Sequence, residues 1–192
     1  PWAKIVFLDG DPAAAFAASN DQLFIPGKTV EVKSGYQNET FTLFKGLIIN
    51  HSVRLRANGS SILMLECRDL AVKMTIGRKS RYFAQVKDSD IISQIAGSYS
   101  GFSTNAEATS VTHKELVQFN CTDWDFILAR AEANGKLCLA DDGTLSVKAP
   151  ALGQSPVLQL QYGATMLEFD GEIDARHQLK KVTSRAWNAA EQ

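Results

Sequence analysis

An Asn-Gly pair between two extended runs is the feature that most constrains the fold of this chain. Asn58-Gly59 separates the run Phe41–Leu55 from the run Ser61–Cys67. Both central positions of a type I′ turn need a positive φ angle, which Asn and Gly adopt at little steric cost. The sequence therefore predicts that the two runs pair as an antiparallel hairpin.

Further patterns in the first half and near residue 140 also predict antiparallel strands. Thr29–Lys33 alternates polar and apolar residues, the period of a half-buried strand. Asp141-Asp142-Gly143 separates Lys136–Ala140 from Thr144–Lys148 and predicts a second hairpin. Gly46 lies inside the long run, where a glycine indicates a bulge or a close approach of another backbone.

The C-terminal part carries two more runs that are expected to be extended. They are Leu158–Phe169 and His177–Trp187. The stretch between them, Glu168–Asp174, shows no clear period.

A first short helix is predicted after residue 87. Asp88 or Ser89 is expected to cap it, because short polar side chains accept hydrogen bonds from free N–H groups at a helix start. Its apolar side is formed by Ile91, Ile92, Ile95 and Ala96, and it is expected to end near Gly97.

A second helix follows a T-x-x-D capping box formed by Thr122 and Asp125. Apolar residues then recur at the spacing of one helix face, which predicts a packed amphipathic helix that stops at Asn134-Gly135. These apolar residues are Trp124, Ile127, Leu128 and Ala131.

The order of strands, short helices and strands favours an α+β fold of mainly antiparallel sheet. We expect two small β-barrel-like domains, with short helices between them and packed on them. The expected division is a first barrel region over 1–75, a mixed segment with two short helices over 76–135, and strands of a second barrel region over 136–192. A length of 192 residues suits one domain or two small ones.

Most motifs that carry catalysis or hold cofactors are missing from the sequence. It contains no phosphate-binding or dinucleotide-binding glycine motif, no H-E-x-x-H and no G-x-S-x-G. The histidines, His51, His113 and His177, are more than 60 residues apart, so none forms a ligand-spaced pair. No catalytic residue, cofactor or metal is therefore expected.

The three cysteines, Cys67, Cys121 and Cys138, are an odd number without CxxC spacing, which fits free buried thiols. The net charge of −1 argues against a protein that coats nucleic acid. No apolar stretch has the composition of a membrane helix, because Ala149–Leu167 is interrupted by Pro, Gly and Gln.

One enzymatic alternative stays open. A hydrolase, acting for example on cell-wall peptidoglycan, would use Asp9, Asp11 or Glu168 together with His177. The simpler interpretation of Asp9-Gly10-Asp11-Pro12 is a turn, because these residue types favour turns.

The charge is distributed unevenly. Residues 45–87 contain nine Lys and Arg residues but only two acidic residues, Glu66 and Asp69, so this segment has a net charge of +7. The densest part, residues 78–81, would suit a nucleic-acid-binding module, a solvated face, or docking to an acidic neighbour. On the docking hypothesis, charge reversal at Arg78 and Lys79 is expected to weaken assembly more than folding.

Three stretches occur in an order and spacing that indicate a known family. Leu43–Ile48 has the pattern F-x-G-x-V, with Gly46 at the glycine. Gly77–Phe83 has the pattern R-x-S-R-x-F. Leu116–Phe126 has the pattern VQY-x-x-(S/T)-D-W-D-F, and the helix after it ends in R-x-A-E-x-x-G. The signature residues are Gly46, Arg78, Ser80, Phe83, Thr122, Asp123, Trp124, Asp125, Phe126 and Gly135.

In these motifs the chain resembles the VgrG, Rhs element Vgr and phage late control protein D family of spike and baseplate-hub proteins. The resemblance runs from about Glu31 to Lys148 and is weakest over residues 1–28. Relatives extend beyond both ends of this sequence, so the chain is expected to be a hub-region fragment. The signature residues are expected to pack rather than to catalyse.

The resemblance implies a structural protein of a contractile injection apparatus: a type VI secretion system, an extracellular injection particle or a phage tail. The full-length protein would be a homotrimer whose barrels adapt a hexameric inner tube to a puncturing needle, and it would also contact baseplate proteins. It would bind no nucleic acid, and this region would not insert into a membrane. It would assemble in the bacterial cytoplasm and then form part of an injected or secreted particle.

Overall fold

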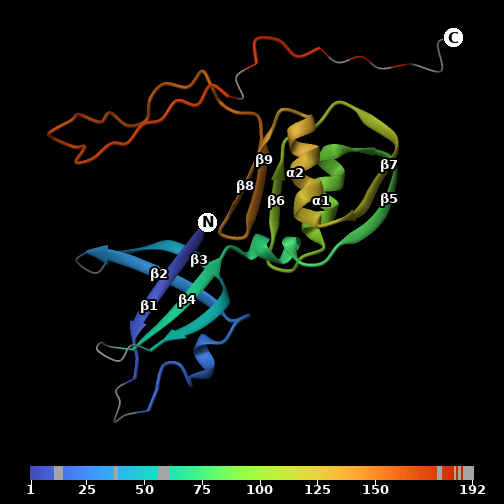
Figure 1. Cartoon of the computed structure of the whole chain (residues 1–192). Helices are drawn as coiled ribbons and strands as arrows, with labels where there is room; N and C mark the ends of the chain where they lie inside the picture. The colour runs from blue at the N-terminus through green and yellow to red at the C-terminus, as the bar shows by residue number, and fades with distance from the viewer. Residues whose placement is uncertain are drawn as a thin grey trace. The chain divides into compact units, whose positions relative to one another are not determined.

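The structure is a computed structural model of the whole chain (Figure 1). It describes all residues except 11–14, 37–38, 56–60, 177–178, 184, 186 and 188–192. Contacts divide the chain into two compact units, 1–151 and 152–192. All of the helices and strands of the described residues belong to the first unit.

The strands are β1 (Trp2–Leu8), β2 (Thr29–Tyr36), β3 (Glu39–Arg54), β4 (Ile62–Arg68), β5 (Lys79–Lys87), β6 (Ser103–Ala106), β7 (Thr112–Cys121), β8 (Leu137–Asp141) and β9 (Thr144–Lys148). The helices are η1 (Gln22–Phe24), η2 (Leu70–Thr75), α1 (Asp88–Gly97) and α2 (Asp123–Ala133).

The first four strands form one antiparallel sheet in the order β1-β4-β3-β2, which curls into a half-barrel (Figure 1). The long strand β3 bends at two irregularities in its pairing, opposite Val32/Lys33 and at Ile48/Asn50. Such bulges increase the local twist and bend of a strand. The bends let one strand pair with β2 along its first half and with β4 along its second half.

The hairpin predicted around residue 58 is formed by β3 and β4. These strands pair antiparallel, with Arg54 opposite Ile62, while the turn Asn58-Gly59 itself lies outside the described residues. The close approach predicted at Gly46 is confirmed, because a Cβ atom there would lie 2.2 Å from the carbonyl oxygen of Arg68. A larger residue at this position would push the backbones of β3 and β4 apart.

The core that packs on this sheet is apolar. Its buried members are Phe44, Ile48, Leu63, Leu65 and Cys67.

Residues 79–148 form a second layered region with two small sheets and two helices (Figure 1). Strands β5 and β7 pair antiparallel, and a separate sheet has the order β6-β9-β8. Strands β6 and β9 are parallel, an exception in a fold that is otherwise mainly antiparallel. The α+β class predicted from the sequence is confirmed. The core of this region contains Phe83, Ile91, Ile92, Ile95, Ala96, Phe126, Ile127, Ala131, Leu145 and Val147, and Met74 of η2 packs into it.

The hairpin predicted at Asp141-Asp142-Gly143 is confirmed. Asp142 has φ +42° and Gly143 has φ +72°, as a two-residue type I′ turn requires. The helix predicted after Thr122 is also confirmed: it is α2, which ends at Ala133 and is followed by Gly135 with φ +63°.

The predicted cap of the first helix is wrong. The N-cap residue of α1 is Lys87, and neither Asp88 nor Ser89 caps it, because both already lie inside the helix. The carboxylate of Asp88 instead accepts hydrogen bonds from other elements, as described below. The buried carboxylate is better compensated by those donors than by one backbone N–H group.

The unit 152–192 differs from the extended runs predicted for it. Among its described residues the structure has only an isolated bridge between Tyr162 and Met166, so the strand predicted over Leu158–Phe169 is not formed. The run His177–Trp187 lies partly outside the described residues, and its described part has no strand. A segment that alternates apolar and polar residues forms a strand only where a second strand is present to pair with it. The three-part domain division stays a prediction.

Candidate functional site

The most highly connected polar site is the carboxylate of Asp123, the first residue of α2. This side chain is fully buried. Its Oδ2 accepts hydrogen bonds from Lys79 Nζ at 2.7 Å, Arg81 Nη2 at 3.2 Å and the Tyr99 hydroxyl at 2.6 Å. Its Oδ1 accepts from Gln118 Nε2 at 2.8 Å. Four donors thus compensate one buried negative charge.

These partners fix the ionisation of the group. Burial raises the pKa of the Asp123 carboxyl, but hydrogen bonds from Lys79, Tyr99 and Gln118 and the charge of Arg81 outweigh it and lower the pKa below its usual value. The same contacts raise the pKa of Lys79. Asp123 is therefore ionised at neutral pH, and its carboxylate ties the start of α2 to β5.

Two signature residues, Arg78 just before β5 and Ser80 near its start, also hold the backbone next to Asp123. Arg78 Nη1 donates to the Asn120 carbonyl oxygen at 2.9 Å, and Ser80 Oγ accepts from the Asn120 N–H at 3.2 Å. Asn120 has φ +44° and lies where the pairing of β5 and β7 shifts register. The R-x-S motif therefore stabilises a bulge at the point where the chain leaves β7 and enters α2.

The remaining signature residues pack or cap. Thr122 Oγ1 accepts from the Asp125 N–H at 3.0 Å, which confirms half of the predicted capping box. The rings of Phe83 and Phe126 stack with centroids 6.0 Å apart, and Trp124 is half-buried.

The structure thus brings together the signature residues of Arg78–Phe83 and Thr122–Phe126, which we call the β5–α2 junction. Gly46 and Gly135 lie in other elements, at the close approach of β3 to β4 and after α2 respectively.

A second buried carboxylate, Asp88, was predicted only as a cap. Its Oδ2 accepts from His113 Nε2 and from Asn134 Nδ2, both at 2.9 Å, and its Oδ1 lies 2.8 Å from Arg130 Nε. Burial raises the pKa of Asp88, but the bonds from His113 and Asn134 and the charge of Arg130 together lower it below its usual value. The partners lie far away in the sequence, so no local signal could have identified them.

Part of the basic segment is neutralised within the chain. Lys79 and Arg81 bind Asp123, and Lys45 Nζ lies 3.3 Å from Asp142. Reversal at Lys79 would remove a cation that compensates a buried carboxylate. That charge reversal at Arg78 and Lys79 weakens assembly more than folding stays a prediction.

Of the residues suggested for a hydrolase, the structure gives Asp9 a structural role. Its carboxylate accepts hydrogen bonds from the N–H groups of Ala18 and Ser19 and from the Ser19 hydroxyl. The hydroxyl bond is the main cause that lowers the pKa of Asp9. Asp11 and His177 lie outside the described residues. Glu168 is exposed and belongs to the other unit.

The cysteines are free, and burial raises the pKa of Cys67 and raises that of Cys138 to about 11. Thiols of this kind are poor nucleophiles at neutral pH. Among the described residues, no cluster of His, Cys, Asp and Glu could hold a metal ion. No helix in the described ranges has the length and apolar character needed to cross a membrane.

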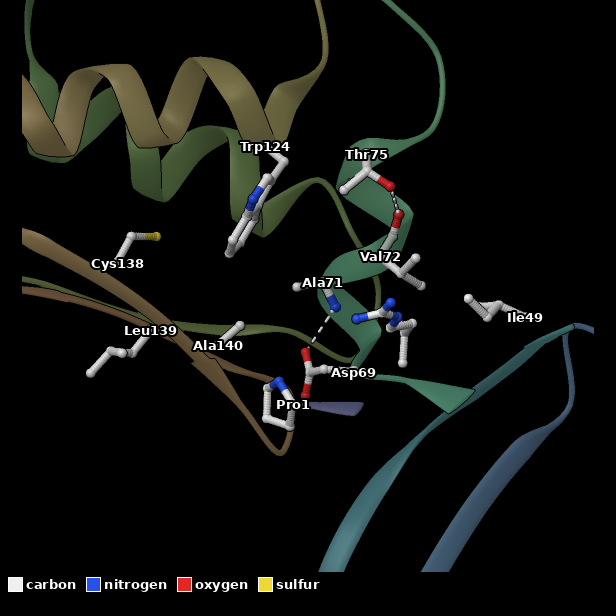
Figure 2. Close-up of a pocket in the computed structure, with 11 residues that line it drawn as sticks. Pro1, Ile49, Asp69, Ala71, Val72, Thr75, Trp124, Cys138, Leu139 and Ala140 are labelled. Carbon is white, nitrogen blue, oxygen red and sulfur yellow. Dashed lines mark hydrogen bonds between the residues drawn. The ribbon is translucent and has the colours of Figure 1, made fainter. Parts of the chain in front are cut away.

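A cavity of about 520 Å³ lies between η2, the start of α2 and β8 (Figure 2). Asp69 lies in its wall and is 4% exposed. Asp69 Oδ1 accepts from the Ala71 N–H at 2.9 Å, whereas the buried Oδ2 has no hydrogen-bond partner among the described residues. The rest of the lining is mainly apolar, including Ile49, Val72, Trp124 and Leu139.

Three solved structures share this fold over part of their length. A tail protein from Neisseria meningitidis is 21% identical, with a TM-score of 0.51 over 60% of this chain and 37% of that one. The tail protein of prophage MuSo2 from Shewanella oneidensis is 11% identical, with a TM-score of 0.53 over 77% of this chain and 44% of that one. An E. coli component of the type VI secretion system is 10% identical, with a TM-score of 0.50 over 66% of this chain and 38% of that one.

The chain spans less than half of the length of these structures, and at such low identity the likeness establishes the fold alone. The fold expected from the sequence motifs is thereby confirmed. No curated protein matches the chain. A family model does match, over residues 1–192, and the chain belongs to the Alg8 N-terminal domain family.

Proposed function

We propose that this chain is the structural hub region of a spike protein in a contractile injection apparatus. The observation that supports this most is the fold, since it is shared with structures described as tail proteins and as a component of type VI secretion. In the full-length protein the region forms a homotrimer, adapts the inner tube to the puncturing needle and contacts baseplate proteins. The protein assembles in the bacterial cytoplasm and leaves with the particle.

A structural role also agrees with the use of the polar residues at the β5–α2 junction. Asp123 has four donors within the chain, and Arg78 and Ser80 hold the Asn120 backbone. Each of these side chains is occupied by a contact that supports the fold. We propose that the region catalyses no reaction.

The oligomeric state tests the proposal. Light scattering over a range of concentrations and at two salt levels is expected to give a mass of three times 21.0 kDa. A chain that stays monomeric under all of these conditions would contradict trimer contacts within residues 1–192.

A peptidoglycan-release assay tests the enzymatic alternative. The chain and its Asp9→Ala variant are both expected to release no soluble fragments. Release that is lost in the variant would identify a hydrolase and overturn the structural role.

A further inference from the structure

Two sheets of residues 79–148 each expose one face. Strands β5 and β6 contact helix α1, and strands β7 and β8 contact helix α2. Figure 1 shows the β5–β7 sheet on one side of the two helices and the β6-β9-β8 sheet on the other. The faces that point away from the helices are therefore separate surfaces on opposite sides of one compact unit.

The exposed face of β5 and β7 is apolar in its middle. Tyr82 lies directly opposite Val117, and Phe119 follows Val117 on the same face. Each of these three side chains is more than half exposed. Because the solvated face of an antiparallel sheet is normally polar, a group of large apolar side chains there indicates an interaction surface. We call it the β5–β7 face.

Opposite charges lie at the two ends of the β5–β7 face. Arg78 lies at the end next to Asn120, whose carbonyl oxygen accepts its hydrogen bond. Glu115 lies at the other end, where its carboxylate accepts a hydrogen bond from the Tyr82 hydroxyl. Lys114 points to the other side of β7, because successive side chains of a strand alternate. This face therefore has a positive end and a negative end.

The exposed face of β8 and β9 has the same arrangement. Leu137 and Leu139 are both more than half exposed, whereas Cys138 between them packs on the core. Figure 2 shows Leu139 and Cys138 on opposite sides of β8. Asp141 continues the row of leucines at the turn, and Lys148 lies opposite Leu137 at the other end. We call this surface the β8–β9 face.

Neighbouring charges do not cancel the two ends of the β8–β9 face. The residue after Asp141 is also an aspartate, and it is paired with Lys45. Glu107 lies near Lys148 but is already paired with Lys136. One negative charge thus remains at the turn, and one positive charge remains at the other end.

The two faces have matching lengths. Residues 115–119 span the β5–β7 face, and residues 137–141 span the β8–β9 face. Four residue steps cover about 13 Å of strand in both. A positive end can therefore meet a negative end at each end of one contact, with the apolar side chains between them.

We propose that the β5–β7 face of one copy packs on the β8–β9 face of a second copy, with Arg78 over Asp141 and Glu115 over Lys148. The second copy is the occupant because the two faces are complementary in charge and both have an apolar centre. They lie on opposite sides of one compact unit, so a single chain cannot bring them together.

This contact joins two different surfaces, as a closed trimer requires. Either face packed on its own copy would produce a two-fold dimer, whereas two different faces close into a ring of three when each copy is rotated by a third of a turn. The inference therefore rests on the homotrimer of the proposed function, and it adds the two faces that form the contact.

Charge exchange between the two faces tests the contact. Arg78→Glu and Asp141→Arg each place like charges opposite one another and are expected to lower the association constant about tenfold. The double variant restores opposite charges and is expected to restore association. Light scattering over a range of concentrations measures the constant, and Asp90→Arg, an exposed position of α1 outside both faces, is the control. Single variants that associate like the control, or a double variant that does not recover, would overturn the proposal.

Chemical linking tests which surfaces meet. A tagged Val117→Cys chain is mixed with an untagged Leu139→Cys chain and a bis-maleimide whose reach matches the spacing of about 10 Å between packed sheets. A covalent heterodimer on a denaturing gel is expected. The matched control replaces the second chain by Leu23→Cys, a similarly exposed position of η1. Heterodimer no more abundant than in this control, the result of a different occupant or of a face packed on itself, would overturn the proposal.

An apolar-to-charged variant keeps the proposal testable if a charge-exchange variant does not fold. Leu137→Asp in the Leu139→Cys chain is expected to lower linking to Val117→Cys about tenfold while circular dichroism is unchanged. Leu23→Asp in the same chain is the control. Unchanged linking in the folded Leu137→Asp variant would overturn the proposal.

The two proposals fail separately. A chain that scatters as a trimer but gives no heterodimer retains the hub proposal and rejects this contact. When Val117→Cys and Leu139→Cys are combined in one chain, linked products that end at three chains support both proposals. Longer products retain the contact and contradict the homotrimer, and a monomer without linked products contradicts both.

Discussion

Helices α1 and α2 both begin with a buried aspartate, but different parts of the chain hold the two carboxylates. Asp123 at the start of α2 is bound by Lys79 and Arg81 from β5. Asp88 at the start of α1 is bound by Arg130 near the end of α2 and by His113 from β7. Helix α2 is therefore fixed at its start by β5 and at its end by α1.

The comparison shows that two similar positions contribute differently to the fold. Asp123 is fully buried and is compensated by one arginine and one lysine, whereas Asp88 has one arginine. Asp123 itself is one of the ten signature residues, whereas Asp88 is not among them. We expect the Asp123 site to be the more sensitive of the two.

The largest effect is expected for Asp123→Asn. The change leaves the ammonium of Lys79 and the guanidinium of Arg81 beside a neutral group, and loss of one partner of a buried ion pair costs about 4 kcal/mol. Urea unfolding measures this free energy. The matched control is Asp125→Asn, an exposed aspartate in the same helical turn, which should change little. Equal effects of the two variants would contradict the special role of Asp123.

The next effect is expected for Lys79→Glu, which places a second carboxylate beside Asp123. The loss of the ion pair together with like-charge repulsion is expected to lower the free energy of unfolding by about 3 kcal/mol. Arg78→Glu is the control, since the hydrogen bond from Arg78 to the carbonyl oxygen of Asn120 is exposed and no buried charge is left without a partner. Thermal unfolding of both variants compares them, and an equal fall in melting temperature would show that Lys79 has no special importance.

A smaller loss is expected for Asp88→Asn. The asparagine still accepts one of the hydrogen bonds, so the free energy of unfolding should fall by about 2 kcal/mol. Asp90→Asn, an exposed position in the first turn of α1, serves as control. If Asp88→Asn destabilised the chain more than Asp123→Asn, the ranking of the two sites would be reversed.

The smallest effect is expected for the dependence of stability on acidic pH. The pKa values of both carboxyls are lower in the folded state than their unfolded value of 3.8. Their contribution to the free energy of unfolding is therefore complete above pH 3.8 and is lost as the pH falls through the folded pKa. The difference in free energy of unfolding between the native chain and Asp123→Asn should therefore become smaller below that pH. Unfolding at about pH 7 and about pH 3 measures it. A difference that becomes larger in acid would contradict the direction of the pKa shift.

Local sequence patterns predicted the elements whose causes are local. The turn at Asp142-Gly143 and the cap at Thr122 each depend on a few neighbouring residues and were predicted. The close approach at Gly46 was predicted from the glycine itself, although the backbone that approaches it belongs to Arg68 on β4. The ion pairs of Asp88 and Asp123 were not predicted, because they join residues 25 to 44 positions apart. Alternation over Leu158–Phe169 predicted a strand, but whether a strand forms depends on a partner that sequence alone does not reveal.

The parallel pairing of β6 with β9 sets an order for the folding reaction. Ser103 pairs with Thr144, and β7, α2 and β8 lie between them in the chain. The β8–β9 hairpin closes over two residues and can form within microseconds, whereas β6 must wait until a long loop has closed. During that interval both edges of the hairpin are open, so the nascent chain is most prone to aggregate after β9 has formed and before β6 docks.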